Sequence, residues 1–98
     1  MTRKLASIHP GEILKEDFME PLGLSAQALG LALKVPANRI SDILRGRRGI
    51  SADTALRLAR HFGTSPEFWL NLQNRYDLET ARDTLGAEIG RIKRRRAA

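Results

Sequence analysis

The sequence contains no cysteine, and its absence excludes several chemistries. Without thiols the chain forms no disulfide, builds no cysteine-based zinc finger and has no cysteine nucleophile. The two histidines, His9 and His61, are far apart and lack the H-E-x-x-H spacing of metalloproteases. We expect them to cap helices or lie on the surface. No serine has a G-x-S-x-G context, so the sequence predicts no enzyme, metal site or cofactor.

Long apolar runs are also missing. No stretch approaches the roughly 18 consecutive apolar residues of a membrane helix, and no signal-peptide core follows the basic start of the chain. We therefore expect no membrane association, and a soluble protein of the cytoplasm. The chain has 98 residues with 42% apolar content, which suits one compact domain.

Positive charge is concentrated in two parts of the chain, whose formal net charge is +6. Residues 34–60 carry seven Lys and Arg against two Asp and Glu, and residues 91–98 carry five Lys and Arg with no acid. The other segments, 1–33 and 61–90, are weakly acidic. A localised basic block indicates a surface that lies on phosphates.

Apolar spacing and capping residues predict an all-α fold with five helices up to about Tyr76. Pro10 suits the first position of the first helix, which we expect to stop near Glu20 because Pro21 disfavours helical geometry before it. No alternation typical of strands interrupts the pattern. Three serines precede helical segments and suit N-cap positions: Ser25, Ser51 and Ser65.

The stretch from Ser25 to Leu44 has the length of a helix-turn-helix motif. We expect its inward positions in the first helix to be Ala28, Leu29 and Leu33, and its second helix to begin at Pro36 and end at Gly46. At about 100° per residue this second helix has an apolar and a polar side. The apolar side carries Ile40, Ile43 and Leu44, and the polar side carries Asn38, Ser41, Asp42 and Arg45.

The polar side of this second helix predicts base contacts, because a recognition helix presents its N-terminal residues to base edges in the major groove. Asn38 is the best candidate, since its amide pairs with adenine. Ser41 suits a base or a phosphate, and Asp42 either accepts from cytosine or repels wrong sequences. Pro36 and Ala37 offer apolar contact only. The alternative for each polar residue is an ordinary exposed side chain.

Phosphate contacts are predicted for residues on and beside the recognition helix. A single arginine is more often a solvated charge, but four within ten residues favour phosphate binding by at least two of them. Arg57 and Arg60, further along, are expected to serve solubility. The predicted phosphate ligands are Gln27, Arg39, Arg45, Arg47 and Arg48.

The pattern weakens after Asp77. Apolar residues still recur at helical spacing to Ile92, but Gly86 and Gly90 each cost about 1 kcal/mol relative to alanine. Such a helix is marginal alone and needs the rest of the domain or a second chain. We expect an N-terminal arm over 1–8, a helix-turn-helix domain over 9–76, and a helical extension with a basic tail over 77–98. Trp69 beside Phe68 is more often a core residue than a partner site, but two adjacent aromatics point about 100° apart and one can lie at an edge. The predicted dimer or partner surface is Trp69, Leu78, Leu85 and Ile89.

Residues 9–81 resemble the HigA-like antitoxins, a branch of the Xre-type helix-turn-helix regulators. The resemblance rests on H-P-G-E-I-L, L-G-L-S, V-P-A-N-R-I-S-D-I-L-R-G-R-R-G-I-S-A-D-T-A-L-R-L-A and F-G-T-S-P-E-F-W-L-N-L-Q-N-R-Y-D-L. It implies a lambda-repressor-like fold, a homodimer bound to a palindromic DNA operator in its own promoter, and neutralisation of a HigB-like toxin, a small ribosome-dependent mRNA endonuclease. A stand-alone repressor and a protein-interaction module without DNA binding remain alternatives.

Three positions depart from the broader Xre pattern. Ala26 stands where many members have a phosphate-binding glutamine, so the resemblance moves that role to Gln27. Gly30 replaces a common alanine at the helix crossing and should still permit close approach. Lys34 replaces the usual turn glycine and carries strain if the turn needs a positive φ.

Overall fold

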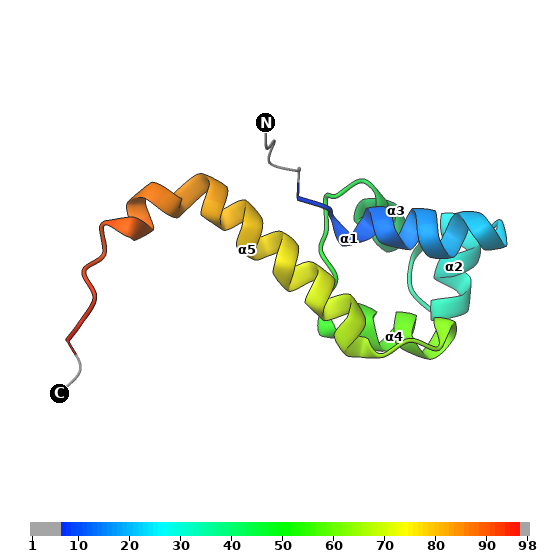
Figure 1. Cartoon of the computed structure of the whole chain (residues 1–98). Helices are drawn as coiled ribbons and strands as arrows, with labels where there is room; N and C mark the ends of the chain where they lie inside the picture. Colours follow the sequence, from blue (N-terminus) through cyan, green and yellow to red (C-terminus); the bar gives the residue numbers. More distant parts are fainter. Residues whose placement is uncertain (1–6, 97–98) are drawn as a thin grey trace.

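The computed structural model describes residues 7–96, which form helices joined by short connections (Figure 1). No strand occurs in this range, so the predicted all-α fold with five helices is confirmed. Most of the predicted arm over 1–8 lies outside the described residues. The α helices are α1 (Pro10–Ile13), α2 (Ala26–Leu33), α3 (Ala37–Leu44), α4 (Ala52–Phe62) and α5 (Pro66–Gly90).

The first helical segment changes its winding along its length. α1 passes directly into a π-helix, η1 (Leu14–Met19), and then into a 3₁₀ turn, η2 (Glu20–Leu22). Gly23, with φ 64°, ends the segment in the left-handed conformation that glycine adopts without steric cost. The helical segment therefore ends at Leu22 rather than near Glu20, and the sequence did not predict its π-helical turn.

Serine side chains begin three of the helices, as predicted. Each hydroxyl accepts a hydrogen bond from the backbone N–H three residues further on and so satisfies an N–H that has no partner within the helix. Such a cap typically stabilises a protein by about 1 kcal/mol. The capping residues and their N···O distances are Ser25 at 3.0 Å, Ser51 at 3.3 Å and Ser65 at 3.1 Å.

One apolar core joins the π-helical segment η1 with α2, α3, α4 and α5. Ile40 and Ile43 of α3 are fully buried in it, as predicted, and Leu44 packs partly buried against it. Ala28, expected to point inward, is exposed. The buried members of the core are Leu14, Met19, Leu29, Leu33, Ile40, Ile43, Ile50, Ala55, Leu58, Ala59 and Trp69.

Trp69 lies inside this core, so its assignment to a partner surface was wrong. Its side chain is fully buried, its indole Nε1 donates to Thr64 Oγ1 at 2.8 Å, and its ring lies 4.9 Å from that of Phe18. The neighbouring Phe68 is 37% exposed. Adjacent helical residues point about 100° apart, and here the tryptophan takes the inner direction.

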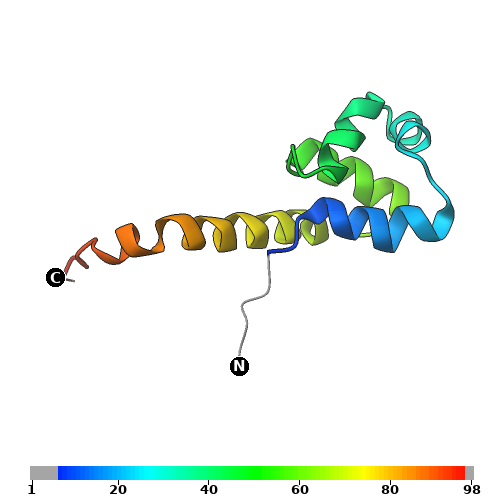
Figure 2. The same cartoon turned by 90° about the horizontal axis from the view of Figure 1, so that it is seen from above.

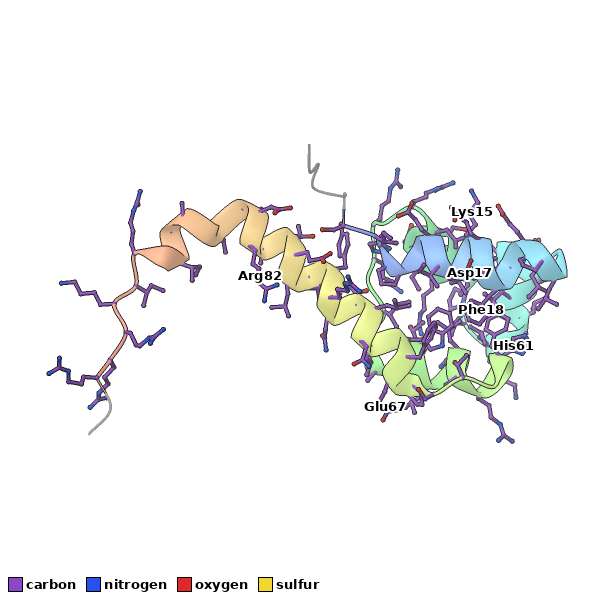
Figure 3. All side chains as sticks on the ribbon, in the orientation of Figure 1. Lys15, Asp17, Phe18, His61, Glu67 and Arg82 are labelled. Carbon is purple, nitrogen blue, oxygen red and sulfur yellow. The ribbon has the colours of Figure 1, made fainter. Side chains whose placement is uncertain are left out.

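α5 is one continuous helix that leaves the body of the molecule (Figures 1 and 2). The predicted boundary near Tyr76 falls inside it, and every residue from 80 to 96 is exposed. Figure 3 contrasts Phe18, within the helical body, with Arg82, on the protruding part of α5. No helix in the described part of the chain is both long and apolar enough to span a membrane.

The protruding half of α5 carries an apolar stripe on the side opposite to its core contacts. Leu78, Leu85 and Ile89 are 54%, 42% and 54% exposed. At about 100° per residue they lie roughly 180° around the helix from Trp69. The first part of α5 therefore turns an apolar face to the core of the domain, and the protruding part turns another apolar face to solvent.

Candidate nucleic-acid interface

The close crossing of α2 and α3 depends on Gly30. A Cβ added there would lie 2.9 Å from the carbonyl oxygen of Val35 and 3.2 Å from the Cα of Ala37. Such distances are too short for an alanine unless the backbone shifts. The glycine therefore permits the close approach expected of it, and Ala37, predicted as a base contact, lies half-buried against α2 rather than free.

The turn between these helices holds Lys34 in a left-handed conformation. Its φ and ψ are 62° and 45°, and it is the single non-glycine residue with positive φ in the described chain. This conformation costs roughly 1–2 kcal/mol for a residue with a Cβ. The strain predicted for a lysine at this turn is present, and the turn orients α3.

Three polar side chains on the outer face of α3 make no bond with any other residue that the structure describes. Asn38 is exposed, and Ser41 and Asp42 are half-buried. None of these three side chains has a hydrogen-bond or ion-pair partner within residues 7–96. Pro36, just before the helix, is exposed in an extended conformation. Amide, hydroxyl and carboxylate groups with unused hydrogen-bonding capacity are the groups that contact base edges.

A basic loop, residues 45–49, continues from the end of α3. Arg45, Arg47 and Arg48 are exposed and form no ion pair within the described chain. The backbone fixes the start of the loop, because Arg47 N and Arg48 N both donate to the carbonyl of Asp42, at 2.8 Å and 3.2 Å. Gly46, with φ 74°, makes the left-handed turn that was predicted to end the helix. The loop thus projects three unpaired guanidinium groups beside α3.

Arg39 differs from the other predicted phosphate ligands. Its Nη1 donates to Asp53 Oδ2 at 2.7 Å, and its side chain is only 26% exposed. Asp53 also accepts from Arg57 Nε at 2.8 Å. The Arg57 hydrogen bond, and then that of Arg39, hold the pKa of the Asp53 carboxyl below its usual value. The structure therefore uses Arg39 to tie α3 to α4, whereas Gln27 remains exposed on α2.

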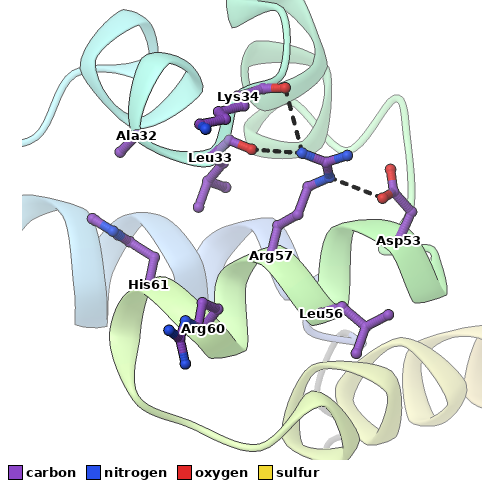
Figure 4. Close-up of a pocket in the computed structure, with 8 residues that line it drawn as sticks. All are labelled: Ala32, Leu33, Lys34, Asp53, Leu56, Arg57, Arg60 and His61. Atoms are coloured by element: carbon purple, nitrogen blue, oxygen red, sulfur yellow. Dashed lines mark hydrogen bonds and ion pairs between the residues drawn. The ribbon is translucent and has the colours of Figure 1, made fainter.

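Arg57 has a structural role that the sequence did not predict (Figure 4). Its Nη1 donates to the carbonyl oxygens of Leu33 at 2.8 Å and Lys34 at 3.4 Å. These carbonyls at the end of α2 have no helical partner, so a cation there also opposes the negative end of the helix dipole. The prediction that Arg57 serves only solubility was wrong, because this side chain joins α4 to the helix-turn-helix.

His9 caps α1, one of the two roles predicted for it. Its Nδ1 accepts from Gly11 N at 2.9 Å, and its ring makes an edge contact with Tyr76 of α5 at 4.8 Å. Partial burial lowers the pKa of His9 below 6.5, against smaller opposite effects of Glu12 and Asp77. No cluster of three potential metal ligands occurs among residues 7–96.

Gln73 is the contact residue that the sequence analysis missed. Its Oε1 accepts from the backbone N–H of Ile50, at the end of the basic loop, at 2.7 Å. The two residues are 23 positions apart, and Gln73 lies on a helix whose role was expected to be apolar packing. No local sequence pattern indicates such a bond.

Comparison with known proteins supports a DNA-related role. A helix-turn-helix family model matches residues 16–69. A curated relative, virulence-associated protein I of Dichelobacter nodosus, is 55% identical over 80% of this chain and 72% of its own length. Antitoxin HigA-1 of Vibrio cholerae is 37% identical over 92% of this chain and 85% of its own length.

Two solved structures of similar fold are described together with DNA. Pseudomonas aeruginosa antitoxin HigA with the higBA promoter has a TM-score of 0.86 and 50% identity, covering 89% of this chain and 96% of that one. Antitoxin GraA in complex with its operator has a TM-score of 0.88 and 49% identity, covering 99% of each chain. In both names a protein of this fold is an antitoxin and its ligand is promoter or operator DNA.

Proposed function

Since the chain belongs to the HigA-like antitoxin branch of the Xre-type helix-turn-helix family, we propose that it is a dimeric DNA-binding antitoxin. In this role it binds a palindromic operator in its own promoter and represses that operon. It also neutralises a HigB-like mRNA endonuclease toxin. It acts in the cytoplasm, where this DNA lies, and it catalyses no reaction itself.

The observation that carries this proposal is the free polar face of α3 beside the basic loop. Asn38 presents an amide with no bond to residues 7–96 near the start of the helix, the part that enters the major groove in helix-turn-helix proteins. At its end lie the charges of Arg45, Arg47 and Arg48, which have no ion-pair partner in the described part of the chain. Side-chain amides read bases and guanidinium groups hold phosphates, so the two sets together fit a duplex.

The protruding part of α5 supports the dimer. Leu78, Leu85 and Ile89 form an exposed apolar stripe in a segment that has no core of its own. Burying such a stripe against a second copy removes roughly 25 cal/mol per Å² of apolar surface from water. The two copies of α3 then lie about 34 Å apart in successive major grooves on one side of the duplex.

Binding to DNA is tested by fluorescence anisotropy with two duplexes of equal length and composition. One carries the sequence upstream of the gene, and the other is a shuffled version of it. We expect the upstream duplex to bind at least about 1,000-fold more tightly, and the affinity for both to fall steeply between about 50 and 200 mM salt. Equal affinity for the two duplexes rejects the repressor role.

Toxin neutralisation is tested with the neighbouring reading frame. We expect that frame to encode a polypeptide of roughly this size whose expression arrests growth, and co-expression of this chain to restore growth. Purification of a tagged toxin should then recover this chain in a stable complex. Growth arrest that persists despite soluble expression of this chain rejects the antitoxin role and leaves the repressor role intact.

A further inference from the structure

Gln73 joins the helix that leaves the domain to the loop that carries the free arginines. Its Oε1 accepts from Ile50 N at 2.7 Å, and its Nε2 donates to Asp77 Oδ1 at 2.8 Å. The second bond fixes the orientation of the amide, so that the oxygen faces the loop. The residue Ile50 is only 4% exposed, and loss of the acceptor would leave its backbone N–H, part-buried in this bond, without a protein partner, which is costly.

The loop is shaped to receive this side chain. A Cβ on Gly49 would lie 2.8 Å from both Cδ and Oε1 of Gln73 and 2.9 Å from Nε2, so any larger residue there would displace the amide. The start of the loop is held differently, by the carbonyl of Asp42 at the end of α3. Among the hydrogen bonds of the described chain, the one from Ile50 to Gln73 is therefore the bond that ties the end of the loop to α5.

A second contact links the same stretch of α5 to the start of the loop. Tyr76, three residues after Gln73, packs against the ring of His9, and that ring faces Gly46, whose added Cβ would lie 3.8 Å from it. Gln73 and Tyr76 contact residues outside α5, whereas every residue from 80 to 96 is exposed. The direction of α5 and the position of the loop are thus set by the same few residues.

We propose that Gln73 is a positioning residue for DNA binding, which holds the basic loop in a fixed place relative to α5. The inference rests on the proposed function, since it assumes that the loop binds phosphate and that α5 pairs with a second copy. In such a dimer each loop is attached to its own α5 by the Gln73 bond, and the two α5 helices contact each other. These contacts together set the distance between the two loops. When the Gln73 bond is intact, the dimer binds only half-sites at one spacing. When the bond is broken, the dimer also accepts half-sites at other spacings.

The experiment uses the full chain with three variants. Gln73→Met keeps the length of the side chain and removes the acceptor. Gln73→Glu combined with Asp77→Asn keeps an acceptor for Ile50 and reverses the donor and acceptor of the second bond. Asn74→Met is the matched control, because the Asn74 side chain is exposed on the same helix and has no hydrogen-bond partner within residues 7–96.

Amide hydrogen exchange at Ile50 measures the bond without DNA. We expect Gln73→Met to accelerate exchange at Ile50 at least about tenfold, while the double variant and the Asn74→Met control retain protection. Thermal unfolding of each variant checks that global stability does not cause the change. Unchanged exchange at Ile50 in Gln73→Met would show that Gln73 does not hold the loop.

Affinity for the upstream duplex, and for the same duplex with one base pair inserted between its half-sites, measures the consequence for DNA. We expect Gln73→Met to bind the upstream duplex about tenfold more weakly. The inserted base pair should also reduce the affinity of this variant much less than it reduces the affinity of the wild-type chain. The double variant should recover both properties. If Gln73→Met exchanges faster at Ile50 but keeps the wild-type affinity and the same loss of affinity on insertion, the inference is overturned. If the wild-type chain shows no preference for the upstream duplex, the proposed function itself is overturned.

Discussion

The outer faces of α3 and of the protruding half of α5 are both free, but their chemistry is opposite. α3 buries Ile40 and Ile43 completely and leaves Asn38 on its outer side. The protruding half of α5 buries nothing and leaves Leu85 and Ile89 exposed. An unpaired polar face suits the hydrogen-bonding edges of a duplex, and an unpaired apolar stripe suits another protein surface.

The two regions also differ in how they are supported. α3 is fixed on several sides, by the Gly30 crossing, by the ion pair of Arg39 with Asp53, and by the buried isoleucines. The end of α5 has helical hydrogen bonds but no core. The structure therefore predicts a rigid base-reading face on α3 and, on α5, an association face whose order depends on a second chain.

The largest effect is expected from Leu85→Glu, which places a charge in the apolar stripe of α5. The variant should sediment as a monomer and bind the upstream duplex about 100-fold more weakly, because the two half-sites are then bound independently. Sedimentation velocity and anisotropy measure the two effects. Leu56→Glu is the matched control, since Leu56 is 60% exposed on α4 and lies outside the stripe; dimerisation by both variants would contradict the assignment.

On the polar face, Asn38→Ala should remove sequence reading without affecting association. We expect affinity for the upstream duplex to fall about tenfold, and affinity for the shuffled duplex to stay unchanged, because a bidentate amide contact discriminates by about 1–3 kcal/mol. Anisotropy with single-base variants of the operator should locate the loss at one position of each half-site. An equal loss on both duplexes would place Asn38 among the phosphate contacts.

The support of α3 is tested by Arg57→Met, which removes the donors to the end of α2. Unfolding in urea should show a loss of about 1 kcal/mol in the free energy of unfolding, since the carbonyl oxygens at the end of α2 lose a charged partner and Asp53 loses its bond from Arg57 Nε. Arg60→Met is the control, because Arg60 is exposed on the same helix and forms no such bond. Equal stability of the two variants would mean that water replaces Arg57 at no cost.

Arg47→Ala should weaken binding to both duplexes by a similar factor, about threefold, because a phosphate contact carries no sequence information. The slope of log affinity against log salt should fall in magnitude by about one. Anisotropy titrations at four salt concentrations measure the slope. A loss confined to the upstream duplex would instead make Arg47 a base-reading residue.

The smallest effect is a pH dependence at His9, beside the start of the basic loop. Burial lowers the pKa of folded His9 below 6.5, so the unfolded chain binds the proton first as the pH falls. The contribution of His9 to stability is therefore present above about pH 6.5 and is lost as the pH drops below it. His9→Asn keeps an N-capping group and should flatten the curve of unfolding free energy against pH below about pH 6.5. An unchanged curve would mean that other groups cause the pH dependence.

The sequence predicted features that depend on neighbouring residues. The caps at Ser25, Ser51 and Ser65 are local hydrogen bonds and were accessible from the sequence. The positive φ of Lys34 was expected only through the family resemblance, in which a glycine usually occupies this turn. The burial of Ile40 and Ile43 followed from the period of one helix.

Features that depend on distant parts of the chain were missed or misassigned. Arg57 reaches carbonyls 24 and 23 residues away, and Gln73 reaches a loop 23 residues away. The extension was separated from the domain after Tyr76 because Gly86 and Gly90 make the following helix marginal alone, whereas α5 continues unbroken from Pro66 to Gly90. Trp69 was placed outside because spacing alone does not say which of two adjacent aromatics faces the core.

Hydroxyl-radical footprinting of the upstream duplex tests most directly whether pairing through α5 places two copies of α3 on the same DNA. If α5 pairs two chains and each α3 enters a major groove, the wild-type protein should protect two patches of backbone about 34 Å apart on one side of the duplex, and Leu85→Glu should lose both at the same protein concentration. One protected patch, or two that survive Leu85→Glu, would contradict the pairing of α5. The absence of any protection would contradict the role of α3.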